Sequence, residues 1–484
     1  MLLSKLFEGE KKLDVRGLAL DSRKVEPGDM FFCLPGYEKN GHDYADMAVD
    51  KGAEFIVHCE DIEKRPGITY IRVGDPRREL SRVCDIFYNY PSSKMLIFGT
   101  TGTNGKTTVS SIIREVFNHK MKCGYMGTLA VRYGDVDKLP NLTTPNQIEV
   151  HENLYDMAEN GMEAAAIEVS SQGLATGRVD TVDFDCVIFT NLTHDHLDFH
   201  KTMGKYFEAK KLLFKRIKRS GIAVLNADDE PSIEGLKDCV NCRYVTYGTG
   251  RCGHADYMAK DIVFSNERTE FTLVNNNREY RIKSDLAAMF NVYNLLAAIA
   301  AMSECGMAID QMIPHLENLK QVDGRVERID EGQNFTVIVD FSHTPDGYEK
   351  MFAYAEDILC EGNNIYAVIG SNGKRDHAKR PEMGAIAAAH ATEVVISTQD
   401  PRDEDPENIA DEMILGMKGT DCRYSFVADR EEAIRKCLSL PKAGDIVLLL
   451  GKGDEPYMYV GEGRIPYKGD HVIAHEALRK MAAK

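Results

Sequence analysis

The chain has 484 residues, of which 43% are hydrophobic and 28% charged, and its formal net charge at pH 7 is −17. This length exceeds what one hydrophobic core usually supports, so about three domains are expected. The acidic balance argues against a nucleic-acid partner, which needs clustered Lys and Arg. No apolar run reaches the roughly 18 residues of a membrane span, and residues 1–12 lack the apolar core of a signal peptide, so a cytoplasmic protein without membrane insertion is expected.

Residues 1–92 form the first predicted unit, a small α/β domain. An apolar run at 30–34 predicts a strand, and polar loops flank it. Ser22 lies in the loop before the strand and His42 in the loop after it. From their chemistry alone, ordinary surface turns are the favoured interpretation of both residues.

A strand, a phosphate loop and a helix open the second unit, residues 93–322. Residues 95–98 are typical of a buried parallel strand, and apolar residues recur at helical spacing over 109–117. Glycines between them let backbone N–H groups approach a polyphosphate, while Lys106 reaches the terminal phosphates and Thr107 can ligate Mg²⁺. The nucleotide-binding residues expected from this loop are Gly102, Thr103, Asn104, Gly105, Lys106, Thr107 and Thr108.

The loop departs from the usual pattern of two glycines separated by four residues, because Thr100 stands where the first glycine is expected. A glycine-rich turn without a ligand is therefore the alternative. ATP and GTP are equally compatible with this stretch.

Later strands of the second unit end in acidic and histidine residues. An apolar run at 164–167 ends at Glu168, and another at 182–190 leads to His196. Because the carboxyl ends of parallel strands meet at one sheet edge, Glu168 is placed to meet Mg²⁺ opposite Thr107. The cluster at 195–200 is also compatible with an acidic helix start without a ligand.

Two helical stretches complete the second unit. Residues 206–217 form a predicted helix with Lys210 and Lys211, and adjacent lysines on a helix are usually solvated. Residues 289–302 are apolar almost throughout and predict a buried helix, interrupted by Asn291 and Asn294. Buried amides need partners, and a bound base and backbone caps are equally plausible ones.

Four apolar strands, at 335–339, 365–369, 394–397 and 446–450, organise the third unit, residues 323–484. Each leads into a charged loop, so the loops should meet at the carboxyl edge of a second parallel sheet. The expected fold is α/β with three domains: a smaller N-terminal domain, a central doubly wound and mostly parallel P-loop sheet, and a C-terminal Rossmann-like sheet.

One cysteine group has the residue types of a zinc site. The group comprises Cys239, Cys242, Cys252 and His254, but the second pair lacks the usual ligand spacing. Ordinary reduced thiols are the favoured interpretation, and bound metal is the alternative.

Taken together, these motifs resemble the Mur ligases, and within them the UDP-N-acetylmuramoyl-tripeptide synthetases. The resemblance covers nearly the whole chain. It rests on DSR (21–23), PGD (27–29), NGH (40–42), TGTNGKTT (101–108), TTP (143–145), EVSSQGL (168–174), NLTHDHLDFH (191–200), EAK (208–210), FNVYN (290–294), GRVE (324–327), DFSHTPD (340–346), KRDHAKRPEMG (374–384), DPRDEDP (400–406) and GKGDE (451–455).

The resemblance implies an ATP-dependent amide ligase that adds a diamino acid to UDP-N-acetylmuramoyl-L-Ala-D-Glu through an acyl phosphate, in peptidoglycan precursor synthesis. Mg²⁺ and a carbamate on Lys210 are the implied cofactors, the partners are small molecules, and a monomer is expected. The implied catalytic residues are Lys106, Glu168, His196 and Lys210, of which the last three, with Thr107, hold metal. Asn294, Arg325, Asp340 and His343 surround the nucleotide. Ser22, His42, Thr143, Thr144, Ser170, Arg178, Arg375, Asp400, Arg402, Gly451 and Glu455 bind the substrates.

Departures from the family pattern concern the amino acid that is added. The usual Asp-Asn-Pro-Arg appears as Gln399-Asp400-Pro401-Arg402, and the usual Gly-Lys-Gly-His-Glu has Asp454 in place of histidine. Arg402 suits the second carboxylate of meso-diaminopimelate, whereas Asp400 suits a bare ammonium such as that of lysine. Diaminopimelate is favoured, with lysine or another amino acid as the alternative.

Other readings of the chain stay open. One alternative is a paralogue of the main stem-peptide enzyme. A folylpolyglutamate-type ligase shares the phosphate loop and the carbamylated lysine, but the DSR and NGH motifs argue against it. A non-catalytic binding protein derived from a ligase is disfavoured by the intact Lys106, Glu168, His196 and Lys210.

Overall fold

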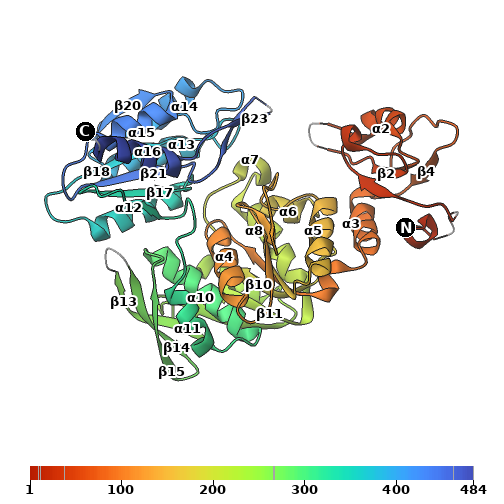
Figure 1. Cartoon of the computed structure of the whole chain (residues 1–484), viewed down its shortest axis with the longest axis horizontal. Coiled ribbons are helices and arrows are strands. Elements are labelled where there is room, and N and C mark those ends of the chain that lie inside the picture. The colour runs from red at the N-terminus through yellow and green to blue at the C-terminus, as the bar shows by residue number, and fades with distance from the viewer. Residues whose placement is uncertain (9, 11, 37–38, 265–267, 462, 483–484) are drawn as a thin grey trace.

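The computed structural model describes residues 1–8, 10, 12–36, 39–264, 268–461 and 463–482, and it contains three α/β units, each with its own main sheet (Figure 1). The first and third units lie on opposite sides of the central one. The predicted three-domain α/β architecture is confirmed.

The first unit is a four-stranded parallel sheet in the order β1-β2-β3-β4. Its strands are β1 (Gly17–Ala19), β2 (Asp29–Phe32), β3 (Phe55–His58) and β4 (Thr69–Arg72), and its helical elements are α1 (Leu3–Leu6), η1 (Ser22–Lys24), η2 (Gly41–Tyr44), α2 (Ala45–Lys51) and α3 (Pro76–Phe87). The inner strands β2 and β3 are buried along their whole length, as parallel strands covered on both faces are. Asp75 caps α3 by accepting from the Arg77 and Arg78 N–H groups.

The central sheet has eleven strands in the order β15-β14-β13-β12-β11-β10-β5-β9-β6-β7-β8. They are β5 (Leu96–Thr101), β6 (Cys123–Met126), β7 (Val131–Tyr133), β8 (Val136–Lys138), β9 (Ala164–Glu168), β10 (Phe184–Phe189), β11 (Ile217–Asn226), β12 (Arg243–Gly248), β13 (Tyr257–Phe264), β14 (Thr269–Asn275) and β15 (Arg278–Ser284). Pairing is parallel from β6 through β9, β5, β10, β11 and β12 to β13, and antiparallel at both ends. The predicted mostly parallel sheet is thus extended by meanders on both edges.

Helices cover this sheet. They are η3 (Pro91–Lys94), α4 (Lys106–Phe117), α5 (Gln147–Glu159), α6 (Ser171–Ala175), α7 (Leu197–His200), α8 (Met203–Lys215), α9 (Glu230–Lys237), α10 (Met289–Glu304) and α11 (Ile309–Glu317). Apolar residues of α4 and α10, such as Ile113 and Leu295, share one core with β5, β9 and β10. The buried helix predicted at 289–302 is α10.

The third unit is a six-stranded sheet in the order β16-β17-β21-β18-β19-β20, parallel except for β16. Its strands are β16 (Glu327–Ile329), β17 (Thr336–Asp340), β18 (Ile365–Ile369), β19 (Glu393–Ser397), β20 (Arg423–Val427) and β21 (Ile446–Leu450), and a separate hairpin consists of β22 (Tyr457–Val460) and β23 (Gly463–Pro466). The helices are α12 (Pro345–Ile358), α13 (Lys379–His390), α14 (Pro406–Met417), α15 (Arg430–Leu438) and α16 (Asp470–Ala482). One core contains residues of α12, α13 and α14 and another contains residues of α15 and α16, which is the doubly wound arrangement.

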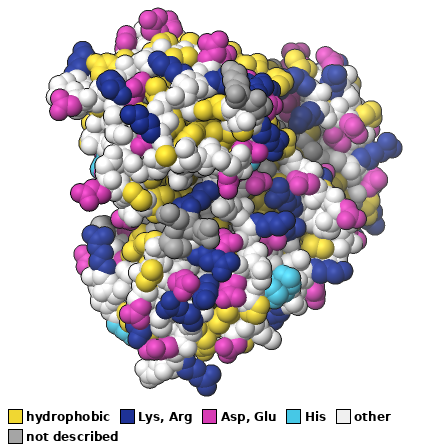
Figure 2. Space-filling model, turned by 60° about the vertical axis from the view of Figure 1, so that its left-hand side comes forward, with side chains coloured by type: hydrophobic (Ala, Val, Ile, Leu, Met, Phe, Trp, Pro, Cys, Tyr) yellow, Lys and Arg dark blue, Asp and Glu magenta, His cyan; other side chains and the backbone are white. Residues whose placement is uncertain are grey.

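The surface mixes both charges. Figure 2 shows acidic and basic side chains interspersed over the face it presents. Within the described part of the chain, no helix is both long and apolar enough to cross a membrane.

Candidate functional site

The phosphate loop joins β5 to α4, and two glycines permit its path. Gly102 has φ +154°, and a Cβ there would lie 1.8 Å from Thr190 Oγ1. Gly105 has φ +87°, and its Cβ would lie 2.4 Å from Asn294 Oδ1 of α10. Larger residues at either position would both strain the backbone and collide with a neighbour. The loop therefore depends on glycine at 102 and 105, two and five positions beyond the departure at Thr100.

Lys106 lies folded over the loop. Its Nζ donates to Gly102 O at 3.0 Å and to Thr103 O at 2.8 Å. Burial lowers the pKa of this ammonium from its ordinary value and Arg325 adds to that effect, while Glu168 and Asp195 oppose it. A cation held in this position is available to an anionic group that enters the loop.

Glu168 ends β9 beside the loop, as its place at the end of a strand predicts, and is fully buried. Thr107 Oγ1 donates to Glu168 Oε2 at 2.8 Å. Thr128 N donates to Oε1 at 2.9 Å, and the Tyr125 hydroxyl donates to the same oxygen. Thr107 and Glu168 thus place a hydroxyl and a carboxylate, both oxygen ligands of the kind Mg²⁺ prefers, within hydrogen-bond distance of each other.

The predicted dipeptide contacts continue from this carboxylate. Thr144 Oγ1 donates to Glu168 O at 2.9 Å and accepts from Ser170 N at 2.9 Å, and Arg178 donates to Thr144 O at 2.8 Å. Thr143 accepts a hydrogen bond from Thr128. Four of the predicted substrate residues, Thr143, Thr144, Ser170 and Arg178, are therefore connected to Glu168 through chains of hydrogen bonds.

Lys210 is 1% exposed on α8, which differs from the usual solvated position of a lysine pair. Its Nζ lies 4.4 Å from the centroid of the Tyr206 ring, one helical turn earlier, and it pairs with no described carboxylate within 4 Å. Burial holds the pKa of Lys210 well below its ordinary value, and the neighbouring Lys106 lowers it further, while Asp195 opposes the shift. A buried neutral amine is the form that reacts with carbon dioxide, so the environment fits a carbamate.

His196 contacts both Asp195 and the tyrosine beside Lys210. Its φ is +56°, and its Nε2 lies 3.3 Å from Asp195 Oδ2. Its ring centroid is 6.0 Å from that of Tyr206, the residue that also contacts Lys210. His196, Glu168, Lys106 and Lys210 are thus brought to one edge of the central sheet.

The third unit docks its loops onto this edge. Asn104 of the phosphate loop donates to Asp346 Oδ2 at 2.7 Å, and His194 lies 2.9 Å from Asp376 Oδ2. Lys379 Nζ, 3% exposed as a residue, lies 3.5 Å from Asp195 Oδ1. The carboxyl edge of the third sheet therefore closes over the phosphate loop.

The residues predicted to surround the nucleotide lie near this junction. The Arg325 guanidinium stacks 4.3 Å from the Phe341 ring, and His343 is held by Phe341 O at 2.9 Å. Burial lowers the pKa of His343 to about 4, and Lys379 adds to this effect. Asp340 accepts from the Val326 and Ser342 N–H groups and so shapes the backbone around Arg325.

The two asparagines of α10 have protein partners. Asn291 donates to Ala287 O at 2.7 Å, and Asn294 donates to Asn291 Oδ1 at 2.9 Å. Backbone capping thus accounts for Asn291. Asn294 presents its other amide atom, Oδ1, to Gly105 in the phosphate loop.

A buried charge cluster lies at the carboxyl edge of the third sheet, after β19 and β21. Lys452, fully buried, donates to Asp400 Oδ1 at 2.9 Å and also to Glu455. Burial raises the pKa of Glu455, while Lys452 opposes that shift. The charge of Asp400, which was expected to face a ligand ammonium, is therefore matched from within the chain.

Two arginines flank this cluster. Arg402 has φ +53° and lies 4.8 Å from the Tyr459 ring centroid, and its buried Nε has no hydrogen-bond partner. Burial lowers the pKa of Arg402 and the nearby Arg375 adds to this effect. Arg375 itself lies 3.5 Å from Asp198 of the central unit.

Several buried polar atoms at this edge lack partners. They follow β18 and β19 and include Ser371 Oγ, Asn372 Oδ1 and Gln399 Oε1. Gln399 Nε2 donates to Gly451 O at 2.8 Å, and Gly451 has φ +118°. Since buried polar groups normally have partners, this edge has the character of a polar ligand site.

The predicted residues of the first unit lie apart from the phosphate loop. Ser22 and His42 follow β1 and β2, at the carboxyl edge of the small sheet, and both are buried. Ser22 Oγ lies 3.2 Å from Met47 Sδ, while His42 accepts from Cys59 N and lies 2.7 Å from Asn40 Oδ1. His42 therefore also connects its own loop to the end of β3 by hydrogen bonds.

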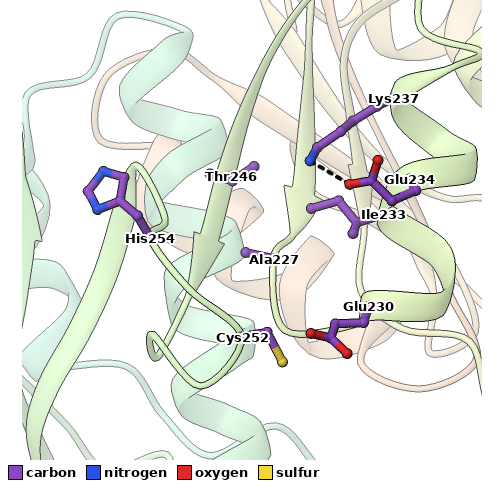
Figure 3. A pocket seen from close by; sticks show the side chains of 8 residues that line it. All are labelled: Ala227, Glu230, Ile233, Glu234, Lys237, Thr246, Cys252 and His254. Carbon is purple, nitrogen blue, oxygen red and sulfur yellow. Dashed lines mark hydrogen bonds and ion pairs between the residues drawn. The ribbon is translucent and has the colours of Figure 1, made fainter.

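The zinc-like group does not gather within the described chain. Among the described residues, only His42, Cys59 and Glu60 bring three ligand atoms of His, Cys, Asp or Glu close together. Figure 3 shows Cys252 beside Glu230 in a surface pocket, with His254 on the other side of that pocket and turned away from it. Cys239 packs instead against the central core.

Sequence reasoning did not single out Tyr125, Tyr206, Lys379 or Lys452. Tyr206 stands four residues before Lys210, so helical spacing could have identified it. Lys379 and Lys452 lie within motifs quoted above, but their partners are distant in sequence. No sequence pattern around Tyr125 indicates that it contacts Glu168.

Three family models match the chain: "Mur ligase family, catalytic domain" over residues 14–85, "Mur ligase middle domain" over 100–302 and "Mur ligase, glutamate ligase domain" over 324–453. Among similar proteins, the UDP-N-acetylmuramoyl-L-alanyl-D-glutamate--2,6-diaminopimelate ligase of Bacillus cereus is 38% identical over 472 residues, which are 96% of this chain and 94% of the relative. The enzyme of the same name from Clostridioides difficile is 38% identical over 478 residues, covering 98% and 97%.

Solved structures agree with these matches. A structure of a ligase of the same name superposes with a TM-score of 0.67 at 29% identity and covers 100% of this chain and 99% of its own. MurF ligase from Thermotoga maritima in complex with ADP gives 0.67 at 19% identity, covering 98% of each chain, which shows a shared fold. By full-length similarity to these relatives, the chain belongs to the Mur ligase family.

Proposed function

We propose that this chain is an ATP-dependent amide ligase that joins meso-2,6-diaminopimelate to UDP-N-acetylmuramoyl-L-alanyl-D-glutamate in peptidoglycan precursor synthesis. ATP would transfer its γ-phosphoryl group to the glutamate carboxylate of the dipeptide, forming an acyl phosphate and releasing ADP. The amine of the incoming amino acid would then attack the acyl phosphate, forming an amide and releasing phosphate. The names of the relatives, which are 36–39% identical over most of the chain, support this substrate pair.

The central unit offers the groups that phosphoryl transfer needs. Lys106 would leave the carbonyls of Gly102 and Thr103 and neutralise charge on the transferring phosphoryl group. Thr107, Glu168, His196 and a carbamate on Lys210 would hold Mg²⁺, since these residues supply a hydroxyl, a carboxylate, an imidazole and a buried amine on which the carbamate would form. When bound, Mg²⁺ would supply Lewis-acid stabilisation of the developing charge.

The third unit supplies closure and exclusion of water. Asp346 and Asp376 contact the phosphate-loop edge through Asn104 and His194. Closure of this kind brings the amine to the acyl phosphate and protects that reactive group from hydrolysis. Asn294, Arg325, Asp340 and His343 would line the nucleotide from this junction, and Ser22 and His42 would contact the uridine diphosphate sugar.

The observation that carries the choice of amino acid is the pairing of Asp400 with Lys452. With that carboxylate paired to Lys452, Arg402 keeps a positive charge and a buried Nε without a partner, which suits a second carboxylate. Glu455 would take an amino group, and Gly451 would provide its carbonyl. L-lysine lacks the second carboxylate and would leave Arg402 unpaired, a penalty that favours diaminopimelate.

Phosphate release tests the proposal. The wild-type chain would be assayed with ATP, Mg²⁺ and UDP-N-acetylmuramoyl-L-Ala-D-Glu against diaminopimelate, lysine and ornithine, with a folate and glutamate as a separate arm. We expect turnover that depends on the muramoyl dipeptide and is fastest with diaminopimelate. Turnover with the folate alone, or none with any amino acid, would reject the proposal. Domain limits near residues 92 and 322, a cytoplasmic location and a monomeric state stay predictions.

A further inference from the structure

A short hairpin in the third unit pairs an arginine with a tyrosine. In the antiparallel register of β22 and β23, Arg464 stands directly opposite Tyr459. Its Nε and Nη2 donate to the Tyr459 hydroxyl at 3.0 and 2.8 Å, and its guanidinium lies 4.1 Å from the Tyr457 ring centroid. Hydrogen bonds and cation–π contacts therefore fix the orientation of both side chains.

Tyr459 in turn holds Arg402. The Arg402 guanidinium lies 4.8 Å from the Tyr459 ring centroid, and Arg402 N donates to Tyr459 O at 3.0 Å. Tyr459 N donates to Asp400 Oδ1 at 3.0 Å. Because Arg402 has the left-handed φ of +53°, which a non-glycine residue rarely adopts, these bonds to the hairpin help to keep it in place.

Arg464 also reaches the central unit. Its Nη2 donates to Asn141 O at 2.7 Å and its Nη1 to Pro140 O at 3.4 Å. These carbonyls come just before Thr143 and Thr144, which are connected to Glu168 by hydrogen bonds. The guanidinium thus bridges the loop next to Glu168 and the hairpin that carries Arg402.

We propose that Arg464 is a positioning residue that couples closure of the third unit to recognition of the amino acid by Arg402, with Tyr459 as the link. This inference rests on the proposed function, because it deepens the selectivity of that same site. The bond to Asn141 exists only while the two units are docked. When they separate, Arg464 loses its carbonyl partners and the hairpin loses an anchor that keeps Tyr459 against Arg402.

The coupling has a consequence for selectivity. An amino acid with a second carboxylate would engage Arg402 and thereby favour the docked state, whereas one without it would not. The preference for one amino acid over the other then includes the free energy of closure as well as the free energy of the contact with Arg402. This is specificity by induced fit.

Kinetics of matched variants test the coupling. Arg464→Met removes the donors while keeping an extended side chain, and Tyr459→Phe removes only the hydroxyl. Arg423→Met is the control, since Arg423 is exposed on β20 and its side chain pairs, among the described residues, with Glu393 alone. We expect Arg464→Met to raise KM for diaminopimelate about tenfold, to lower the preference for diaminopimelate over lysine about tenfold, and to change KM for ATP less than about twofold.

Tyr459→Phe should show a smaller change in the same direction, and Arg423→Met none. Equal loss of activity with both amino acids would indicate a merely structural role and overturn the inference. An unchanged preference in Arg464→Met would overturn it as well.

Hydrogen exchange provides a readout that does not depend on turnover. In the full chain, Arg464→Met should speed amide exchange in residues 139–142 and in 457–460 together, at least about tenfold relative to Arg423→Met. Unchanged exchange in the central-unit loop would overturn the coupling, even in a chain that turns over every amino acid. Absence of turnover in the wild type would instead defeat the proposed function and leave the exchange result to decide the coupling.

Discussion

Replacing Arg402 and Asp400 separately tests how the third unit chooses its amino acid. Arg402 offers a buried Nε without a protein partner, so Arg402→Met should remove a charged hydrogen bond to the second carboxylate. Such a bond contributes about 1.5–3 kcal/mol, which corresponds to a loss of about tenfold to 150-fold in the preference for diaminopimelate over lysine.

Asp400→Asn should behave differently. Its carboxylate already faces Lys452 Nζ at 2.9 Å, so its removal should leave the preference within about twofold. Lys452 would then pair with Glu455 alone, which should raise KM for both amino acids alike because Glu455 is expected to hold an amino group that both possess.

The assay is phosphate release under conditions in which each amino acid in turn is limiting, reported as the ratio of the two kcat/KM values. The wild type and the control Arg423→Met give the reference ratio. If Asp400→Asn changed the ratio more than tenfold while Arg402→Met left it unaltered, the assignment of selectivity to Arg402 would be refuted.

Three further substitutions have defined outcomes. Lys106→Met should lower dipeptide-dependent ATP hydrolysis by about 10²–10³ without unfolding the chain, as phosphate release and circular dichroism can check. Gly105→Ala should weaken ADP binding in calorimetry at least tenfold, because its Cβ would meet Asn294 Oδ1, whereas Gly134→Ala, also at positive φ but with open space around it, should bind ADP normally. Burial and then Asp183 raise the pKa of Asp85 to about 6 against an ordinary 3.8, so the folded state binds more protons between these values and loses stability as pH rises through them. Asp85→Asn should therefore raise the free energy of unfolding, measured by urea titration, by about 1–3 kcal/mol at pH 8 and have little effect near pH 4. An equal shift at both pH values would contradict the last expectation.

Much of the central site follows from strand ends. Glu168 and the phosphate loop come directly after parallel strands, so their meeting at one sheet edge could be expected without knowing the structure. The same reasoning placed the loops after β17, β18, β19 and β21 together. These predictions succeed because a parallel sheet has only one carboxyl edge.

Other contacts depend on information that no short stretch carries. Asp400 and Lys452 meet because β19 and β21 both lie next to β18, an order that the sequence does not display. Lys210 resembles its neighbour Lys211 in sequence, yet only Lys210 points into the core beside Tyr206. The antiparallel strands β14 and β15 were missed because alternating charged residues hide the buried face formed by Phe271, Leu273 and Ile282.

The facing edges of the central and third sheets also determine how chimeras of such an enzyme can be designed. In the proposed function the phosphate loop belongs to the central sheet, and the arginines that would recognise the amino acid's carboxylate belong to the third, so exchanging the third unit between relatives should change the amino acid while keeping the phosphate loop. Such a chimera must preserve the contacts between the central and third units. Three contacts between the units must be kept as matched pairs: Asn104 with Asp346, His194 with Asp376, and the Asn141 carbonyl with Arg464. Without them, the exchanged third unit would lack the hydrogen bonds that dock it on the central unit.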